Sequence, residues 1–192
     1  MENADRPSRL SQVPFHGPLS EARATSLTKR LTRNRPRTVL DIGCGWGELM
    51  LRILAAAPDA TGVGIDLDDD DLARGRATAR ARGLADRVTF ARESGMATTR
   101  EPADLVLCVG ASHALSDVQP PGQTEAALTA LRRLVTHGGR VLLGEGFWQR
   151  PPTTAELAAM WPGTTAGELL DLARIADLAV AAGFLFGITW RR

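Results

Sequence analysis

A glycine-rich turn is the part of this sequence whose residue types and spacing point most directly to chemistry. Asp41 is followed by Gly43, Gly45 and Gly47, and Cys44 lies inside the run. Glycine has no Cβ and adopts positive φ without strain, so backbone amides at such a turn can approach a ligand closely. An apolar strand pattern before the turn and a helical pattern after it predict a socket of nucleotide size.

The spacing of the glycines distinguishes between two kinds of nucleotide site. A dinucleotide-binding fingerprint places its third glycine three residues after the second, and in this sequence Glu48 stands there. The observed pattern is G-x-G-x-G. A nicotinamide-dependent oxidoreductase is therefore a disfavoured alternative.

An acidic residue at the end of the next predicted strand supports a nucleoside ligand. Asp66 closes the apolar run 60–67, and Leu67 follows it. A carboxylate is an acceptor-only group that can take hydrogen bonds from both hydroxyls of a ribose. We therefore expect Asp66 at the ribose and Leu67 beside the adenine.

Two candidates for proton transfer follow later predicted strands. His113 comes after the strand 103–109, and Glu145 comes after the strand 140–144. Ligands of open parallel sheets bind outside the carboxyl ends of the strands, where the strand order reverses, so both side chains are expected at one site. Imidazole titrates near neutrality, which makes His113 the first choice for a catalytic base. The alternative is that His113 only shapes the pocket.

The glycine turn and Asp66 resemble the first two cofactor motifs of the class I S-adenosylmethionine-dependent methyltransferases, and residues 134–144 are similar to that family's post-helix motif. The resemblance covers roughly residues 13–190. It implies S-adenosyl-L-methionine as cofactor and a small-molecule acceptor, because the motifs of base-modifying methylases are absent. In the family the glycine turn passes under the methionine part of the cofactor.

The resemblance also implies a role for individual residues. Glu93 stands where the family usually carries an aspartate near the adenine amino group, and His113 and Glu145 are the catalytic candidates. His16 and Trp148 are expected on the substrate side, and aromatic faces such as those of Trp46 and Trp148 can attract the cationic sulfonium. The expected cofactor-binding residues are Asp41, Gly43, Cys44, Gly45, Gly47, Asp66, Leu67, Glu93, Ser94, Val109 and Gly110.

The elements that position these residues predict one α/β domain. The fold class is a doubly wound, Rossmann-like parallel sheet in the order 3-2-1-4-5-6, apparently without the family's seventh strand, because the chain stops after a sixth strand over 184–190. Such a sixth strand is an exposed edge that invites pairing with another chain. Residues 1–12 are expected to form a flexible tail and 13–192 a single methyltransferase domain, in which 13–36 form a helical lid and 37–192 the cofactor-binding core.

Composition excludes several partners. The chain has 23 Lys plus Arg against 22 Asp plus Glu, so no strong field attracts nucleic acid. The first nine residues lack the apolar core of a signal peptide and no stretch is long enough to span a membrane, so we expect a cytoplasmic protein. The aspartate run 68–71 is expected to cap a helix, and no metal site is predicted. A non-catalytic S-adenosylmethionine-binding or scaffold protein stays an alternative, because no catalytic base is unmistakable.

Overall fold

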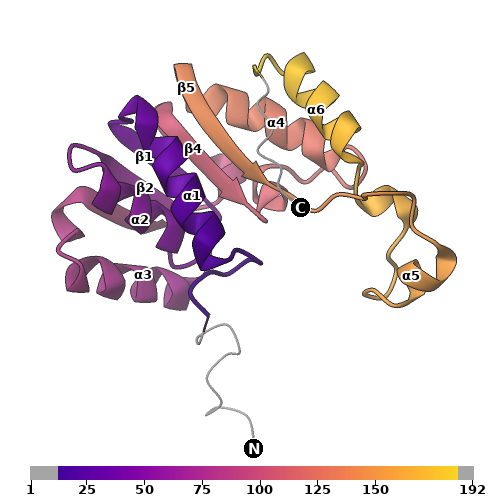
Figure 1. Cartoon of the computed structure of the whole chain (residues 1–192), viewed down its shortest axis with the longest axis horizontal. Coiled ribbons are helices and arrows are strands. Elements are labelled where there is room, and N and C mark those ends of the chain that lie inside the picture. Colours follow the sequence, from indigo (N-terminus) through magenta and orange to yellow (C-terminus); the bar gives the residue numbers. More distant parts are fainter. Residues whose placement is uncertain (1–12, 186–192) are drawn as a thin grey trace, which may run out of the picture.

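The protein is built around a five-stranded parallel sheet. The structure, a computed structural model, describes residues 13–185 (Figure 1). The sheet order is β3-β2-β1-β4-β5, with the reversal between β1 and β4, which confirms the predicted fold class for these strands. Within 13–185 the sheet contains no antiparallel strand. The strands are β1 (Thr38–Ile42), β2 (Thr61–Asp66), β3 (Val88–Arg92), β4 (Ala103–Val109) and β5 (Val135–Gly144).

Helices cover both faces of the sheet. One buried cluster joins the first three helices to the sheet, and a second cluster lies between the sheet and α4. A smaller cluster packs α6 against α4, and the two helices lie side by side in Figure 1. The helices are α1 (Glu21–Leu31), α2 (Glu48–Ala56), α3 (Asp69–Ala81), α4 (Gln123–Leu134), α5 (Thr154–Ala158) and α6 (Leu172–Ala181). None of these helices has the length and apolar character needed to cross a membrane.

Polar side chains set several helix ends as the sequence predicts. The Ser20 hydroxyl accepts a hydrogen bond from the amide of Arg23 and caps α1. The Asp68 carboxylate accepts from the amides of Asp70 and Asp71, so the aspartate run caps α3. Among residues 13–185, no group of three or more His, Cys, Asp or Glu side chains could hold a metal ion.

One strand boundary differs from the prediction. The predicted strand starts at 140, whereas β5 begins directly after α4 at Val135, so the segment 137–139 lies inside β5. Gly138 has a φ of 76° and lets the strand bend there. The last helix, α6, begins at Leu172, because the Asp171 carboxylate accepts from the Arg174 amide and caps the helix.

Two predictions fall outside the described part of the chain. The tail 1–12 lies outside it completely, and the sixth strand 184–190 lies mostly outside it. Among the described strands β5 is an edge of the sheet. Pairing of a sixth strand or of another chain at this edge therefore stays a prediction.

Candidate active site

The glycine turn has the backbone geometry that its sequence predicts. Gly43, Gly45 and Gly47 have φ values of 61°, 52° and 66°. The amide of Cys44 donates to the carbonyl of Ile65 at 3.1 Å, which fastens the turn to the end of β2. Since α2 begins directly after Gly47, the turn lies between two strand ends and a helix N-terminus.

Two of these glycines are also needed for packing. A Cβ on Gly43 would lie 2.4 Å from the Cβ of Ala111, in the loop after β4. A Cβ on Gly47 would lie 2.6 Å from the ring of Phe90 on β3. The turn is therefore held tightly between the neighbouring elements, and larger residues are excluded for steric reasons as well as for their φ.

Asp66 joins the glycine turn to the end of β2. Its Oδ2 accepts a hydrogen bond from the amide of Gly45 at 2.7 Å, and its Oδ1 accepts from the amides of Leu67 and Asp68 at 2.7 and 3.1 Å. Each carboxylate oxygen has two lone pairs, so acceptor capacity remains for a ligand hydroxyl. The carboxylate is thus part of the turn itself, which the sequence did not indicate.

Asp41 is a buried carboxyl group at the carboxyl end of β1. Its exposed fraction is 7%. Burial, and then the nearby charge of Asp66, raise the pKa of Asp41 to about 8. Burial and the same two carboxylates also raise the pKa of the Cys44 thiol, which makes it a structural and unreactive thiol.

Glu93 lies where the sequence places it, at the carboxyl end of β3, but its carboxylate already has partners. Its amide donates to the carbonyl of Asp66 at 3.0 Å. Its Oε2 accepts from the guanidinium of Arg100 at 2.7 Å, and its Oε1 accepts from the Thr98 hydroxyl. Ser94, which follows it, is half-buried. A contact from Glu93 to adenine would have to share these lone pairs.

Two large apolar side chains are exposed near this edge. Leu67 after β2 is 60% exposed, and Met96 after β3 is 57% exposed. β2 and β3 are neighbours in the sheet. Leu67 was predicted to line an adenine pocket, and Met96 is a second candidate that the sequence did not reveal, since no local pattern distinguishes it from a core methionine.

The ends of β4 and β5 are tied together beside the turn. Gly110 has a φ of 68°, and its amide donates to the carbonyl of Gly144 at 2.7 Å. Val109, the last residue of β4, is 37% exposed. This link brings the loop that carries His113 next to Glu145, which directly follows β5.

His113 and Glu145 line one cavity of about 270 Å³ beyond the ends of β4 and β5. The two predicted catalytic candidates are therefore together, although more than thirty residues separate them in the chain. The other lining residues come from the loop after β4, the start of α4 and the segment before α6. They are Ser112, Pro120, Pro121, Gln123, Thr124, Gly146, Trp161, Glu168, Leu169 and Leu170.

A short polar chain holds Glu145. The side-chain Nε2 of Gln123 donates to the Ser112 hydroxyl at 2.9 Å, and Ser112 in turn hydrogen-bonds the Glu145 carboxylate. Burial raises the pKa of Glu145, while the bonds from Ser112 and the charge of His113 act in the opposite direction. Among the described residues, the buried Oε1 of Glu145 has no hydrogen-bond partner.

Trp148 lies on the acceptor side but supports the wall of the cavity from behind. Its indole nitrogen donates to the carbonyl of Ala166 at 2.9 Å, and its amide donates to the carbonyl of Leu170 at 2.9 Å. These bonds hold the segment that carries Trp161 and Glu168. Trp161, which is 52% exposed, lines the cavity in its place. No local pattern in the sequence indicates this position of Trp161, because the path of the segment depends on distant contacts.

The segment before α1 packs against the glycine turn. The indole nitrogen of Trp46 donates to the carbonyl of Pro14 at 2.9 Å, and the Arg74 guanidinium lies 3.8 Å from the centre of the same indole ring. His16 Nε2 lies 3.6 Å from Asp71 Oδ2, and a Cβ on Gly45 would be 3.3 Å from the His16 ring. His16 thus lies at the glycine turn and is absent from the described residues that line the cavity, and the Trp46 ring is already covered.

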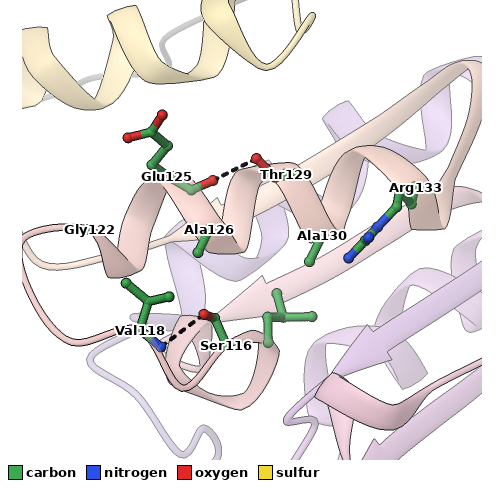
Figure 2. Close-up of a pocket in the computed structure, with 9 residues that line it drawn as sticks. Ser116, Val118, Gly122, Glu125, Ala126, Thr129, Ala130 and Arg133 are labelled. Carbon is green, nitrogen blue, oxygen red and sulfur yellow. Dashed lines mark hydrogen bonds between the residues drawn. The ribbon is translucent and has the colours of Figure 1, made fainter.

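A second depression lies along α4 (Figure 2) and has no predicted site residue in its wall. It measures about 470 Å³ and is wide open. Ala126 and Ala130 form its floor, between Glu125 at one end and Arg133 at the other. Since it does not reach the glycine turn residues, it is not part of the candidate active site.

Comparisons with known families and sequences agree with this geometry. A family described as "Methyltransferase domain" matches residues 40–141, which is more than half of the chain. The uncharacterized protein YjhP of Escherichia coli is 30% identical over 164 residues, covering 84% of this chain and 63% of YjhP. A methyltransferase of Aspergillus campestris, ungE', is 34% identical over 113 residues, covering 57% of this chain and 32% of that protein. The chain thus spans less than two thirds of these relatives.

Solved structures show the same fold. An S-adenosylmethionine-dependent methyltransferase of Geobacter sulfurreducens, in complex with S-adenosyl-L-homocysteine, superposes with a TM-score of 0.77 and 27% identity. The match covers 91% of this chain and 68% of that one. The corresponding complex from Thiobacillus denitrificans has a TM-score of 0.75 and 28% identity, with the same coverage of 91% and 68%.

Proposed function

We propose, since this chain belongs to the class I S-adenosylmethionine-dependent methyltransferases, that it transfers a methyl group from S-adenosyl-L-methionine to a small-molecule acceptor. The observation that carries the proposal is the position of the glycine turn. Its Gly43 contacts Ala111, one residue before the Ser112 and His113 that line the cavity. A cofactor on the turn and an acceptor in the cavity would therefore be neighbours.

The cofactor side of the site would be held by backbone and carboxylates. The backbone amides of the turn would contact the methionine part of the cofactor, and the Asp41 carboxylate would compensate the positive charge of its amino group. Asp66 would accept from the ribose hydroxyls, while Leu67 and Met96 would cover the adenine. Glu93 would contribute only by sharing the lone pairs that Arg100 and Thr98 use. Ser94, Val109 and Gly110 would complete the wall.

Methyl transfer asks little further of the protein. The sulfonium of the cofactor supplies an electrophilic methyl group, so the site must align the nucleophile and accept its proton. His113 is proposed as the acceptor of this proton, and Glu145 as the group that orients the acceptor beside it. Both line the cavity, and Glu145 is half-buried there.

Three further assignments belong to this proposal. His16 and Trp148 act indirectly, His16 at the cofactor turn and Trp148 through the segment it holds. Residues 13–36 form a unit that covers the turn, and 37–192 form the core. We also propose a cytoplasmic location, which suits the two free thiols Cys44 and Cys108.

Titration calorimetry tests the cofactor, and product formation tests the reaction. We expect S-adenosyl-L-homocysteine and S-adenosyl-L-methionine to bind at one site, and NAD not to compete. Release of S-adenosyl-L-homocysteine is then measured with a panel of small hydroxyl, amine and thiol acceptors. Binding without turnover on any acceptor would favour a non-catalytic protein, and competition by NAD would contradict the assigned cofactor.

A further inference from the structure

The segments that build the cavity are strongly acidic. Between residues 110 and 131 there is no Lys or Arg, and between 145 and 173 the single basic residue is Arg150. The Arg150 guanidinium is paired with Glu156, with an Nη1–Oε2 distance of 3.0 Å. Glu145 and Glu168 both line the cavity, and His113 is the histidine among its described lining residues. Among the residues 13–185 that line the cavity, an anionic acceptor would meet two carboxylates and no Lys or Arg.

One carboxylate oxygen in this wall lacks a partner. Glu145 uses its bonds to Ser112 for support, yet its Oε1 is buried and without a hydrogen-bond donor among the described residues. Because Oε1 has almost no accessible surface, a ligand in the cavity meets the charge of the Glu145 carboxylate as a whole and not this oxygen. A carboxylate bonds more strongly to a cationic N–H than to a neutral donor.

The rest of the wall suits a flat or aliphatic body that carries such a donor. Leu169, Leu170 and the two prolines 120–121 supply apolar surface, and Trp161 adds an aromatic side chain. The ring of Trp161 is half-exposed and is available to a cation, because aromatic faces attract ammonium groups. The volume of about 270 Å³ is that of a small cavity for a mono- or bicyclic ligand.

We propose that this cavity holds its acceptor by a positively charged nitrogen, bound between Glu145, Glu168 and Trp161. The proposal rests on the proposed function and names the class of acceptor. An ammonium has no lone pair, so the nitrogen is the group by which the acceptor is held, and the methylated nucleophile is a different, neutral atom near His113. Molecules of the same shape that carry a carboxylate or phosphate are excluded by repulsion from the two glutamates.

Three matched probes test this preference in protein saturated with S-adenosyl-L-homocysteine. The probes are 2-phenylethylamine, 2-phenylethanol and 3-phenylpropanoate, which share a phenyl ring and differ in charge. Titration calorimetry is expected to show the amine binding at least about tenfold more tightly than the alcohol, and the carboxylate most weakly. Added salt should reduce the preference, since the charges are partly exposed.

Charge-neutral variants locate the preference. Glu145→Gln and Glu168→Gln should each reduce the amine-to-alcohol ratio by about threefold or more, while binding of S-adenosyl-L-homocysteine stays within about twofold. Glu101→Gln is the matched control, because it removes the same charge from an exposed site just before β4, at the opposite end of that strand from His113. It should leave the ratio unchanged.

The outcomes separate this inference from the proposed function. If S-adenosyl-L-homocysteine binds and the amine has no advantage, or does not bind measurably, the inference is overturned and the methyltransferase assignment stands. A tighter carboxylate would overturn it as well. An advantage that persists in both glutamine variants would show that the charge is recognised elsewhere. Failure of S-adenosyl-L-homocysteine to bind would contradict the proposed function itself.

Discussion

The cofactor side and the acceptor side of this site are built in different ways. The turn from Asp41 to Gly47 is continuous in the sequence, and Asp66 reaches it with a single hydrogen bond to Gly45. The cavity takes its walls from three separate segments: the stretch from the end of β4 to the start of α4, the residues directly after β5, and the segment before α6. The cofactor side is mostly backbone, whereas the acceptor side is mostly side chains.

This difference explains which substitutions each side tolerates. Backbone amides present the same groups whatever the side chains are, but they need glycine at positive φ. A wall of side chains can change its shape and charge by single substitutions without disturbing the sheet. We therefore expect substitutions at the turn to affect cofactor affinity, and substitutions in the cavity to affect rate or acceptor choice.

The largest expected effect is on the rate. His113→Ala should lower the rate of methyl transfer by roughly 10²–10⁴, with nearly unchanged affinity for S-adenosyl-L-homocysteine, because it removes the proposed proton acceptor. Single-turnover kinetics and calorimetry measure the two quantities. His137→Ala, in β5 and outside the cavity lining, is the control. Parallel loss of affinity and rate would make His113 a structural residue and would erase the distinction between the two sides.

The next effect falls on affinity. Gly45→Val should weaken binding of S-adenosyl-L-homocysteine by about a hundredfold or more, since the φ of 52° is unfavourable for valine and the added side chain meets His16. Gly83→Val is a matched control, with a φ of 66° and open space around it. Thermal unfolding should show similar strain in both variants. Equal affinities for the two would remove Gly45 from the cofactor site.

Removing the carboxylate of Asp66 should have a somewhat smaller effect. Asp66→Ala is expected to lower the affinity for S-adenosyl-L-homocysteine about tenfold to a hundredfold. The variant loses a charged acceptor for the ribose hydroxyls and for the Gly45 amide. Asp70→Ala removes a charge nearby and should change the affinity by less than about twofold. Calorimetry compares the variants. A similar loss in both would point to general electrostatics instead of a specific acceptor.

The affinity should also depend on pH through Asp41. Its pKa of about 8 lies above the ordinary 3.8, so the ligand-free carboxyl group is protonated at neutral pH. A cationic amino group of the ligand favours the ionised form of Asp41, so binding below pH 8 releases a proton from this carboxyl group. The affinity for the ligand therefore increases by up to about tenfold per pH unit as the pH rises toward 8. Calorimetry in buffers of different ionisation enthalpy measures this proton. Asp41→Asn should bind without the slope.

The raised pKa of Asp41 also makes the stability of the ligand-free protein depend on pH. The unfolded chain ionises Asp41 near pH 4, whereas the fold keeps it protonated up to about pH 8. Its contribution to stability is therefore fully present at low pH and is lost as pH rises through this range. Saturation with S-adenosyl-L-homocysteine should flatten this loss in thermal unfolding. An unchanged slope would show that the ligand's cation does not lie near Asp41.

The smallest effect concerns the segment before α1. His16→Ala should lower the affinity for S-adenosyl-L-homocysteine by about two- to threefold and leave the turnover rate unchanged. The effect is small because the His16 side chain is 57% exposed and pairs weakly with Asp71. Calorimetry and steady-state kinetics distinguish the outcomes. Gln149→Ala, an exposed change on the acceptor side, is the control. A change in rate without a change in affinity would restore His16 to the substrate side, as the sequence predicts.

The sequence alone determined the parts of this protein that are local. The glycine spacing, the acidic residue closing β2 and the apolar strands gave the fold class and the cofactor turn, because backbone geometry and strand ends depend on neighbouring residues. The same reasoning placed His113 and Glu145 at one site, since the carboxyl ends of parallel strands share one edge of the sheet.

The tertiary structure alone decided the parts that depend on distant contacts. The bonds from Trp148 to Ala166 and Leu170 set the path of the segment that carries Trp161 and Glu168 into the cavity. The bond from Trp46 to Pro14 fastens the segment that carries His16 beside the glycine turn. No periodicity or spacing encodes such contacts, because they form between side chains and carbonyls that only the folded chain brings together.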